Sequence, residues 1–182
     1  MKENILKWMG GKHALAPYII GKMPPHNGYV EVFGGALHVF FQKPISSRMN
    51  VVNDLNGNLV NMYKVINDPL EFERLNHYLD HSLYDRNMFN YLQKIYRNGG
   101  NIWRQMSTAE RAFVFIYLNR SSFNGKTVDY AKRVDPGIMY NLKSIIKQVF
   151  VKLQAVTVDN APGVAIRIHA LPAPVTPERC MP

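Results

Sequence analysis

The stretch "GYVEVFGGALHVFF" (residues 28–41) shows how the fold begins, because it changes character halfway along. The apolar residues between 29 and 33 indicate a short buried strand. Gly34 and Gly35 predict a tight turn, and residues 36–43 then have the apolar spacing of a helix. The chain therefore passes from a strand to a helix through a pair of glycines.

The same order returns in "RMNVVNDLNGNLVNMYKVIND" (residues 48–68). Val51 and Val52 indicate a second strand, residues 53–56 a turn and residues 57–66 a helix. Two strand–turn–helix units in succession are typical of parallel βαβ structure. The sequence therefore predicts an α/β fold with a parallel sheet.

Most of the remaining chain reads as helix. Residues 70–112 are polar with apolar spacing near 3.6, and residues 107–121 begin with Ser107 or Thr108 followed by Glu110, which resembles a capping box. Asn124-Gly125 is a hairpin signal. A further helix is expected before "VTVDN" (residues 156–160), which should lead into another strand.

Bulk composition limits the class of protein. The chain has 182 residues, of which 47% are apolar, and it contains a single cysteine, Cys180. No apolar run approaches the length of about 18 residues that a membrane span needs. No secretory signal pattern opens the chain. We therefore expect a soluble cytoplasmic protein of one domain, or one domain with an insert, that is a monomer without a membrane or metal partner.

Positive charge dominates the sequence, with a net charge of +9 and a pI near 9.7. Between residues 86 and 126 there are seven basic residues and one acid, Glu110, with aromatic residues interspersed, and Lys132 and Arg133 follow. Basic residues among aromatic rings suit nucleic acid. A solvated helical face over core aromatics explains this pattern equally well, so charge alone does not decide between the two interpretations.

The Gly-Gly-Lys of "KWMGGK" (residues 7–12) first suggests a phosphate-binding loop. That motif needs a glycine where Leu6 stands and Ser or Thr where His13 stands, so an ATP or GTP site is excluded. The predicted strand ends offer another ligand site, because Gly34-Gly35 follows the first strand and Asp54 follows the second. The alternative is a plain turn with Asp54 capping the next helix, but together the features favour a nucleoside cofactor.

Four motifs in order carry a family resemblance: "LKWMGGK", "YVEVFGGALHVFF", "VVNDLN" and "FIYLNRSSFNGK". Over residues 2–160 the chain resembles the Dam-type (D12 class) adenine-N6 DNA methyltransferases. The resemblance implies a Rossmann-like S-adenosylmethionine-dependent fold with an incomplete sheet and a mostly helical DNA-recognition insert. It implies S-adenosylmethionine as cofactor, double-stranded DNA as partner and methyl transfer to adenine N6.

The resemblance also assigns site residues. Trp8 and Lys12 would line the pocket near the methionine end of the cofactor, and Asp54 would hold its ribose. The expected cofactor-binding residues are Trp8, Gly10, Gly11, Lys12, Glu31, Phe33, Gly34, Gly35 and Asp54. Phe123 would intercalate beside the target, and the other expected DNA contacts are Asn119, Arg120, Asn124 and Lys126. One departure is Leu37, which stands where relatives usually have the second glycine of F-x-G-x-G.

By this resemblance the chain divides into four parts. We expect the N-terminal part of the cofactor-binding domain at 1–66, the helical recognition insert with its hairpin at 67–140, and a return helix and strand start at 141–160. Residues 161–182 form an irregular tail that holds five of the eleven prolines. His77 and His81 share a helix face, but the sequence around them lacks the metalloprotease pattern, so a surface role is favoured.

The family's catalytic D-P-P-Y motif does not occur in this sequence. The only Pro-Pro pair, Pro24-Pro25, follows Met23 and precedes His26. We therefore assign no catalytic residue and expect a chain truncated before that motif. Two functions stay open: an adenine-specific DNA methyltransferase, catalytically incomplete in this form, or a non-catalytic DNA-binding fragment of an interrupted methyltransferase gene. Methylation of DNA by the purified chain separates them.

Overall fold

The computed structural model describes residues 5–44, 49–131, 136–154 and 156–161. The predicted tail, apart from Ala161, and the basic pair Lys132 and Arg133 lie outside these residues.

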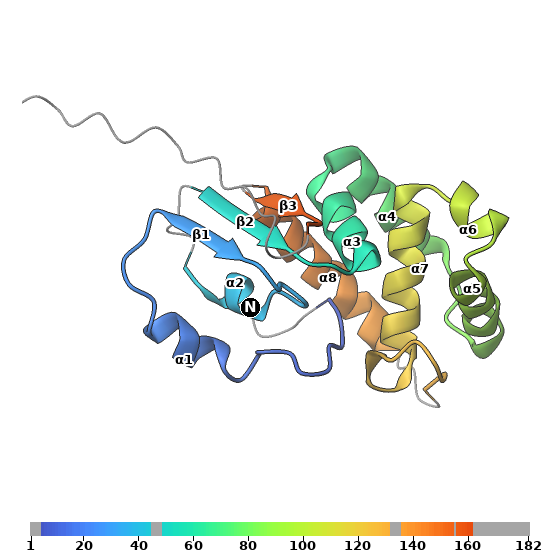
Figure 1. Cartoon of the computed structure of the whole chain (residues 1–182). Coiled ribbons are helices and arrows are strands. Elements are labelled where there is room, and N and C mark those ends of the chain that lie inside the picture. The colour runs from blue at the N-terminus through green and yellow to red at the C-terminus, as the bar shows by residue number, and fades with distance from the viewer. Residues whose placement is uncertain (1–4, 45–48, 132–135, 155, 162–182) are drawn as a thin grey trace, which may run out of the picture.

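A small parallel sheet forms one end of the molecule (Figure 1). Its strands are β1 (Gly28–Glu31), β2 (Met49–Asn53) and β3 (Thr157–Asp159), in the order β1-β2-β3. Val30 pairs with Val51, and Val52 pairs with Val158, all in parallel register. The predicted α/β fold with a parallel sheet is confirmed, and the carboxyl ends of all three strands meet at one edge.

Each of the first two strands leads into a helix, as the sequence predicts. β1 is followed by the short helix α2 (His38–Gln42), and β2 is followed by α3 (Gly57–Asn67). The side chain of Asn56 caps α3, accepting hydrogen bonds from the backbone N–H groups of Asn58 and Leu59. Asn56 therefore does the capping that the alternative interpretation gave to Asp54.

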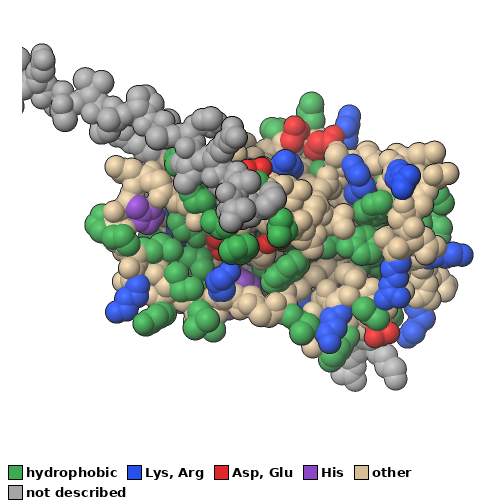
Figure 2. Space-filling model, in the orientation of Figure 1, with side chains coloured by type: hydrophobic (Ala, Val, Ile, Leu, Met, Phe, Trp, Pro, Cys, Tyr) green, Lys and Arg blue, Asp and Glu red, His purple; other side chains and the backbone are tan. Residues whose placement is uncertain are grey.

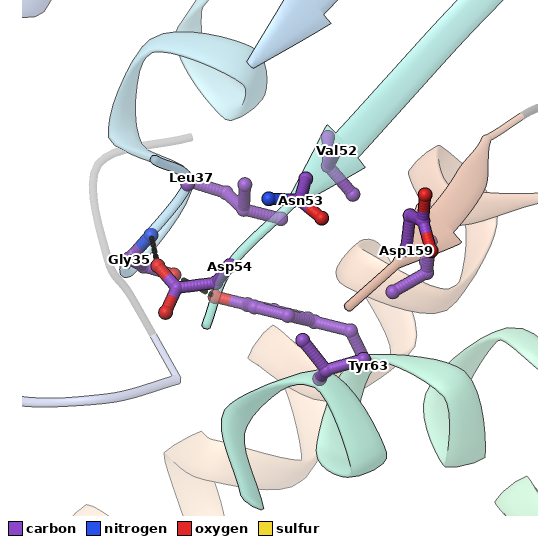
Figure 3. Close-up of a pocket in the computed structure, with 10 residues that line it drawn as sticks. Gly35, Leu37, Val52, Asn53, Asp54, Tyr63 and Asp159 are labelled. Atoms are coloured by element: carbon purple, nitrogen blue, oxygen red, sulfur yellow. Dashed lines mark hydrogen bonds between the residues drawn. The ribbon is translucent and has the colours of Figure 1, made fainter. Parts of the chain in front are cut away.

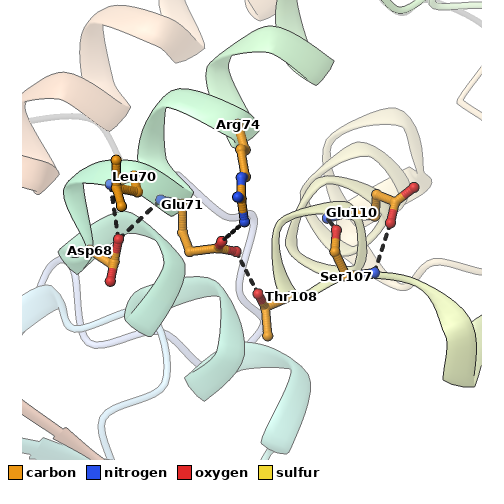
Figure 4. A network of polar contacts seen from close by, with 7 residues as sticks. All are labelled: Asp68, Leu70, Glu71, Arg74, Ser107, Thr108 and Glu110. Carbon is orange, nitrogen blue, oxygen red and sulfur yellow. Dashed lines mark hydrogen bonds and ion pairs between the residues drawn. The ribbon is translucent and has the colours of Figure 1, made fainter.

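Side-chain caps also start the next long helices (Figure 4). Asp68 caps α4 (Pro69–His81), and Ser107 and Glu110 form a complete capping box at the start of α7 (Thr108–Ser121). Glu71 of α4 accepts a hydrogen bond from Thr108, so the two helix starts are tied together. The capping box predicted from the sequence is confirmed.

Helix α7 lies at the centre of the helical region and is buried on all sides, from Ala112 to Leu118. It packs against α3, α4 and α5 (Arg86–Asn98). Helix α8 (Pro136–Leu153) packs against α3 and α4, while α5 and α6 (Asn101–Gln105) lie at the end opposite the sheet (Figure 1). An apolar helix surface all round is expected only where neighbours cover every face.

One continuous hydrophobic cluster extends from Ile5 to Val156 and crosses the predicted boundary at residues 66 and 67. The division into a cofactor-binding part and an insert stays a prediction, since both parts share this core. Helix α1 (Ala16–Gly21) has Pro17 in its first turn, where a proline does not break the helix because its missing N–H would have no partner there. No helix in the described ranges is long and apolar enough to cross a membrane.

Candidate cofactor pocket and recognition turn

A pocket of about 180 Å³ opens beside the carboxyl ends of β1 and β2. Three segments that are distant in sequence build it: the "KWMGGK" stretch, the glycine turn after β1 and the acid after β2. Its lining consists of Trp8, Gly10, Gly11, Lys12, Phe33, Gly34, Gly35, Ala36, His38 and Asp54. The structure thus brings together eight of the nine predicted cofactor-binding residues, all except Glu31.

Asp54 joins the two strand ends (Figure 3). Its Oδ2 accepts a hydrogen bond from the backbone N–H of Gly35 at 2.8 Å, and its Oδ1 accepts one from Asn56 at 2.9 Å. The hydroxyl of Tyr63 donates to the Gly35 carbonyl at 3.0 Å. Burial raises the pKa of Tyr63 well above its usual range, so this hydroxyl keeps the proton that it donates. The glycine turn is therefore held from both sides.

Two glycines of the pocket have no room for a side chain. A Cβ atom on Gly35 would lie 2.9 Å from Nε1 of Trp8, and one on Gly11 would lie 2.3 Å from Nε2 of His38. Gly35 also has a φ of 51°, in the left-handed region that glycine adopts without strain. At both glycines the backbone therefore packs directly against a side chain from another segment, Gly35 against Trp8 and Gly11 against His38.

Lys12 and Phe33 both line the pocket and are joined by a hydrogen bond. The Lys12 ammonium donates a hydrogen bond to the Phe33 carbonyl at 3.3 Å, and the Phe33 side chain is 67% exposed. A lysine held by a single backbone carbonyl still has donors for an anionic group.

Leu37 does not enter this pocket, although it replaces the glycine that relatives usually have. Its side chain is 1% exposed and lines a smaller cavity between the strand ends, which it shares with Val52, Tyr63 and Asp159 (Figure 3). Its backbone has a φ of 53°, the left-handed conformation that a glycine would adopt. The turn therefore keeps the glycine-type shape while carrying a leucine.

Glu31 lies outside the pocket. It is 8% exposed, and its Oε2 accepts hydrogen bonds from the Tyr29 hydroxyl at 2.8 Å and the Phe40 N–H at 3.2 Å. Among the described residues, its Oε1 has no hydrogen-bond partner. Burial raises the pKa of the Glu31 carboxyl, and the Tyr29 hydrogen bond and the charges of Lys12 and Lys43 oppose this shift. The structure therefore gives Glu31 a place in the core.

This raised pKa predicts how the stability of the chain depends on pH. The folded state binds the Glu31 proton more tightly than the unfolded state, so its contribution is fully present below the unfolded pKa and is lost as pH rises through the folded pKa. As pH rises above 4.5, the ordinary pKa of this carboxyl, the free energy of unfolding should fall less in Glu31→Gln than in the parent. Each unit between the two pKa values is worth about 1.4 kcal/mol.

Urea unfolding between pH 4 and pH 8 measures this effect, with Glu73→Gln on the exposed face of α4 as the control. The control should keep the parent's pH dependence. An unchanged pH dependence in Glu31→Gln would show that Glu31 titrates alike in both states.

The sequence did not identify three residues of this region. His38 lines the pocket, and burial followed by the charges of His13 and Lys12 lowers its pKa, which favours a neutral imidazole at pH 7. Tyr63 and Asp159 line the adjoining cavity, which shares Gly34, Gly35 and Asp54 with the pocket. Asp159 is the last residue of β3, within the "VTVDN" stretch, and its place near a strand end was the available signal for it.

The predicted hairpin appears as a turn with a single antiparallel bridge, between Ser122 and Tyr130. Asn124 and Gly125 have φ values of 52° and 72°, and the N–H of Lys126 donates to the Phe123 carbonyl at 3.2 Å. Two central residues with positive φ are what an Asn-Gly type I′ turn requires. We call residues 122–131 the recognition turn.

The predicted DNA contacts differ in how the recognition turn presents them. Phe123 is 63% exposed, and Asn124 and Lys126 are also exposed. Asn119, by contrast, is 2% exposed, and its amide hydrogen-bonds to backbone groups of Lys7 and Gly125. Arg120 is partly buried at the end of α7. The structure thus places three of these five side chains at the surface and uses Asn119 inside the fold.

Basic side chains gather beside this turn. Figure 2 shows Lys and Arg more densely over the half of the molecule formed by α5, α6 and α7 than over the sheet. Lys94, Arg97 and Arg104 are exposed there. Gln93 of α5 donates hydrogen bonds to the carbonyls of Thr127 and Val128, so the basic helix and the turn are directly joined.

His77 and His81 lie on one face of α4, as predicted. Their rings are 4.2 Å apart, and Nδ1 of His81 hydrogen-bonds to the His77 carbonyl. Within the described part of the chain, no group of three or more His, Cys, Asp or Glu side chains could hold a metal ion.

Comparison with known proteins identifies the family. A sequence model of the D12 class N6 adenine-specific DNA methyltransferases matches residues 8–134. A type II methyltransferase, M1.LlaDCHI of Lactococcus lactis subsp. cremoris, is 35% identical over 123 residues, 65% of this chain and 41% of that protein. The DNA adenine methylases of Serratia marcescens and Escherichia coli K12 are each 30% identical, over 69% of this chain and 45% and 44% of their own lengths.

The region matched by the family model includes the pocket and the whole recognition turn, and the chain spans less than half the length of these curated relatives. A family match over residues 8–134 covers more than half of the 182 residues. The chain therefore belongs to the D12 class of N6 adenine-specific DNA methyltransferases.

Proposed function

We propose that this chain binds S-adenosylmethionine in the pocket and duplex DNA along the recognition turn, as part of an adenine-N6-specific DNA methyltransferase. The observation that carries the proposal is the convergence of "KWMGGK", the glycine turn and Asp54 on one pocket. The relatives' names describe adenine methylation of DNA, which supports the same assignment.

The residues of the pocket fit such a cofactor. A Cβ atom on Gly35 or Gly11 would collide with Trp8 or His38, so these glycines let both side chains pack closely at the wall of the pocket. Lys12 would pair with the cofactor's carboxylate, and Asp54 with the hydroxyls of its ribose. The adjoining cavity extends the site from Asp54 toward Asp159. S-adenosylmethionine supplies an electrophilic methyl group when bound.

The proposal names no catalytic residue, because no Asp, Asn or Ser of the 182-residue sequence is followed by Pro-Pro and an aromatic residue. What these residues supply is binding and orientation. Exposed Phe123 at the tip of the recognition turn is suited to insert between bases, with Lys126 beside it on the phosphate backbone.

DNA binding should depend strongly on salt and on the basic helices. Each phosphate contact lowers the slope of log affinity against log salt by about 0.9, so removing three contacts should make the slope shallower by up to about 2.7. We expect this for the triple variant Lys94→Ala, Arg104→Ala and Lys126→Ala, measured by fluorescence anisotropy with mixed-sequence duplex DNA at several salt concentrations.

A second triple variant removes the same charge elsewhere. Lys22 directly after α1, Lys64 on α3 and Lys147 on α8 are exposed, and their replacement by alanine should leave the slope within error of the parent. Equal slopes for the two triple variants would remove the α5–α7 region from the DNA interface.

A further inference from the structure

The N-terminal segment, residues 7–12, touches both the recognition turn and the pocket. At its first residue, the backbone N–H of Lys7 donates to Oδ1 of Asn119 at 2.8 Å, and the Lys7 carbonyl accepts from Nδ2 of Asn119 at 3.0 Å. The same Nδ2 donates to the Gly125 carbonyl at 3.2 Å. One buried amide thus ties together the end of α7, the N-terminal segment and the recognition turn.

Two further contacts reinforce this junction. The Lys7 ammonium donates to the carbonyls of Arg120 at 2.9 Å and Ser122 at 3.4 Å, where α7 ends and the turn begins. A Cβ atom on Gly125 would lie 2.2 Å from the Lys7 carbonyl oxygen, so the backbone of the turn rests directly on the segment. The turn and the N-terminal segment are therefore in direct packing contact.

The other end of the segment forms a wall of the pocket. Trp8 packs on Gly35, Gly11 packs on His38, and Lys12 donates to the Phe33 carbonyl. Lys7, which supports the turn, directly precedes the stretch from Trp8 to Lys12, whose residues line the pocket. A ligand that orders this stretch therefore also restricts Lys7.

We propose that the N-terminal segment couples cofactor binding to DNA binding, with Asn119 as the positioning residue that transmits the effect to the recognition turn. This inference rests on the proposed function, since it assumes the cofactor in the pocket and DNA on the turn. A cofactor that orders residues 7–12 removes part of the ordering cost that DNA would otherwise meet at the turn. By linkage, DNA raises the affinity for the cofactor by the same factor.

The test measures DNA affinity with and without saturating S-adenosylhomocysteine, which occupies the pocket without transferring a methyl group. For the full 182-residue chain and mixed-sequence duplex DNA, we expect tighter binding by about fivefold or more, the lower end of ordinary coupling between sites. For Asn119→Ala the ratio of DNA affinities with and without S-adenosylhomocysteine should fall below about twofold, because the amide that hydrogen-bonds to both Lys7 and Gly125 is lost.

The matched control is Gln93→Ala. Gln93 also holds the recognition turn, through the carbonyls of Thr127 and Val128, but it does so from α5 and not from the N-terminal segment. This variant should bind DNA more weakly, but S-adenosylhomocysteine should still tighten its DNA binding by the same factor as in the parent. A general loosening of the turn would lower the ratio in both variants and would overturn the specific role of Asn119.

Hydrogen exchange on the parent chain tests the coupling without any substitution. The N–H groups of Lys126 and Thr127 are hydrogen-bonded within the turn, and that of Ala131 donates to Ser121 at the end of α7, so all three should exchange more slowly when S-adenosylhomocysteine is bound. Two results would overturn the coupling alone. One is unchanged exchange of these three N–H groups, and the other is a parent that binds both ligands but has the same DNA affinity with and without S-adenosylhomocysteine. A parent that fails to bind either ligand would overturn the proposed function and the coupling with it.

Discussion

Replacement of Asp54 by alanine should weaken binding of S-adenosylmethionine by roughly 10- to 150-fold, since a hydrogen bond to a charged group is worth about 1.5–3 kcal/mol. The carboxylate has two functions in the proposed site. It would accept the ribose hydroxyls, and it already orients the glycine turn through the Gly35 N–H. Isothermal titration calorimetry measures the change.

A second variant separates ligand contact from the shape of the turn. Within the described residues, the Lys12 ammonium donates its hydrogen bond to the Phe33 carbonyl, so Lys12→Ala removes a charge from the pocket with little effect on its walls. We expect a loss of affinity in the same range, about 1.5–3 kcal/mol, if Lys12 pairs with the cofactor's carboxylate.

Asp68 provides the matched control. It accepts the N–H groups of Leu70 and Glu71 at the start of α4, much as Asp54 accepts two backbone N–H groups, but it lies outside the pocket. Asp68→Ala should lose about 0.5–2 kcal/mol of stability as a helix cap and keep its cofactor affinity. Parent-like affinity in both Asp54→Ala and Lys12→Ala would show that the pocket assignment is wrong.

Leu37→Gly should leave the protein more stable than Leu37→Ala, even though glycine is the smaller residue. Either change removes a buried leucine side chain, and Leu→Ala in a core costs about 2–5 kcal/mol. Alanine would keep the left-handed φ of 53° with its steric cost of about 1–2 kcal/mol, which glycine does not have. The difference in urea unfolding should approach 1 kcal/mol after the greater freedom of glycine in the unfolded chain is included.

Leu75, in the middle of α4, is a control for which we expect the opposite order of stability between the glycine and alanine variants. It is fully buried in a regular helix, where glycine costs about 1 kcal/mol more than alanine. Leu75→Gly should therefore be less stable than Leu75→Ala. If Leu37→Gly were also the less stable of its pair, the left-handed conformation of Leu37 would carry no strain.

Local interactions explain why the sequence predicted so much of this architecture. A strand, a glycine turn and a helix each depend on neighbouring residues, so β1 with α2 and β2 with α3 could be read directly. The capping box of Ser107 and Glu110 joins residues three positions apart, and the Asn124-Gly125 turn depends on two adjacent φ angles. The pocket residues were located by motif, and the parallel sheet brings those motifs to one edge.

Contacts between distant segments had to be read from the tertiary structure. Asn119 and Lys7 are 112 positions apart in the sequence. Only the tertiary structure shows that Asn119, next to the recognition turn, is buried and hydrogen-bonded to Lys7. Glu31 belongs to the same glycine-turn motif as Gly35, but its side chain points into the core, because successive strand residues face opposite sides of the sheet. His38 joins the pocket because Gly11 packs against it.

The sequence by itself therefore determined the order of the elements, the parallel sheet and the family, because these follow from short-range chemistry and from motifs in fixed order. The tertiary structure decided which motif residues share a pocket, which are buried and how Leu37 fits in place of a glycine. Those outcomes depend on how side chains from separate segments fill a common space, and packing of that kind is not encoded in any one stretch of the chain.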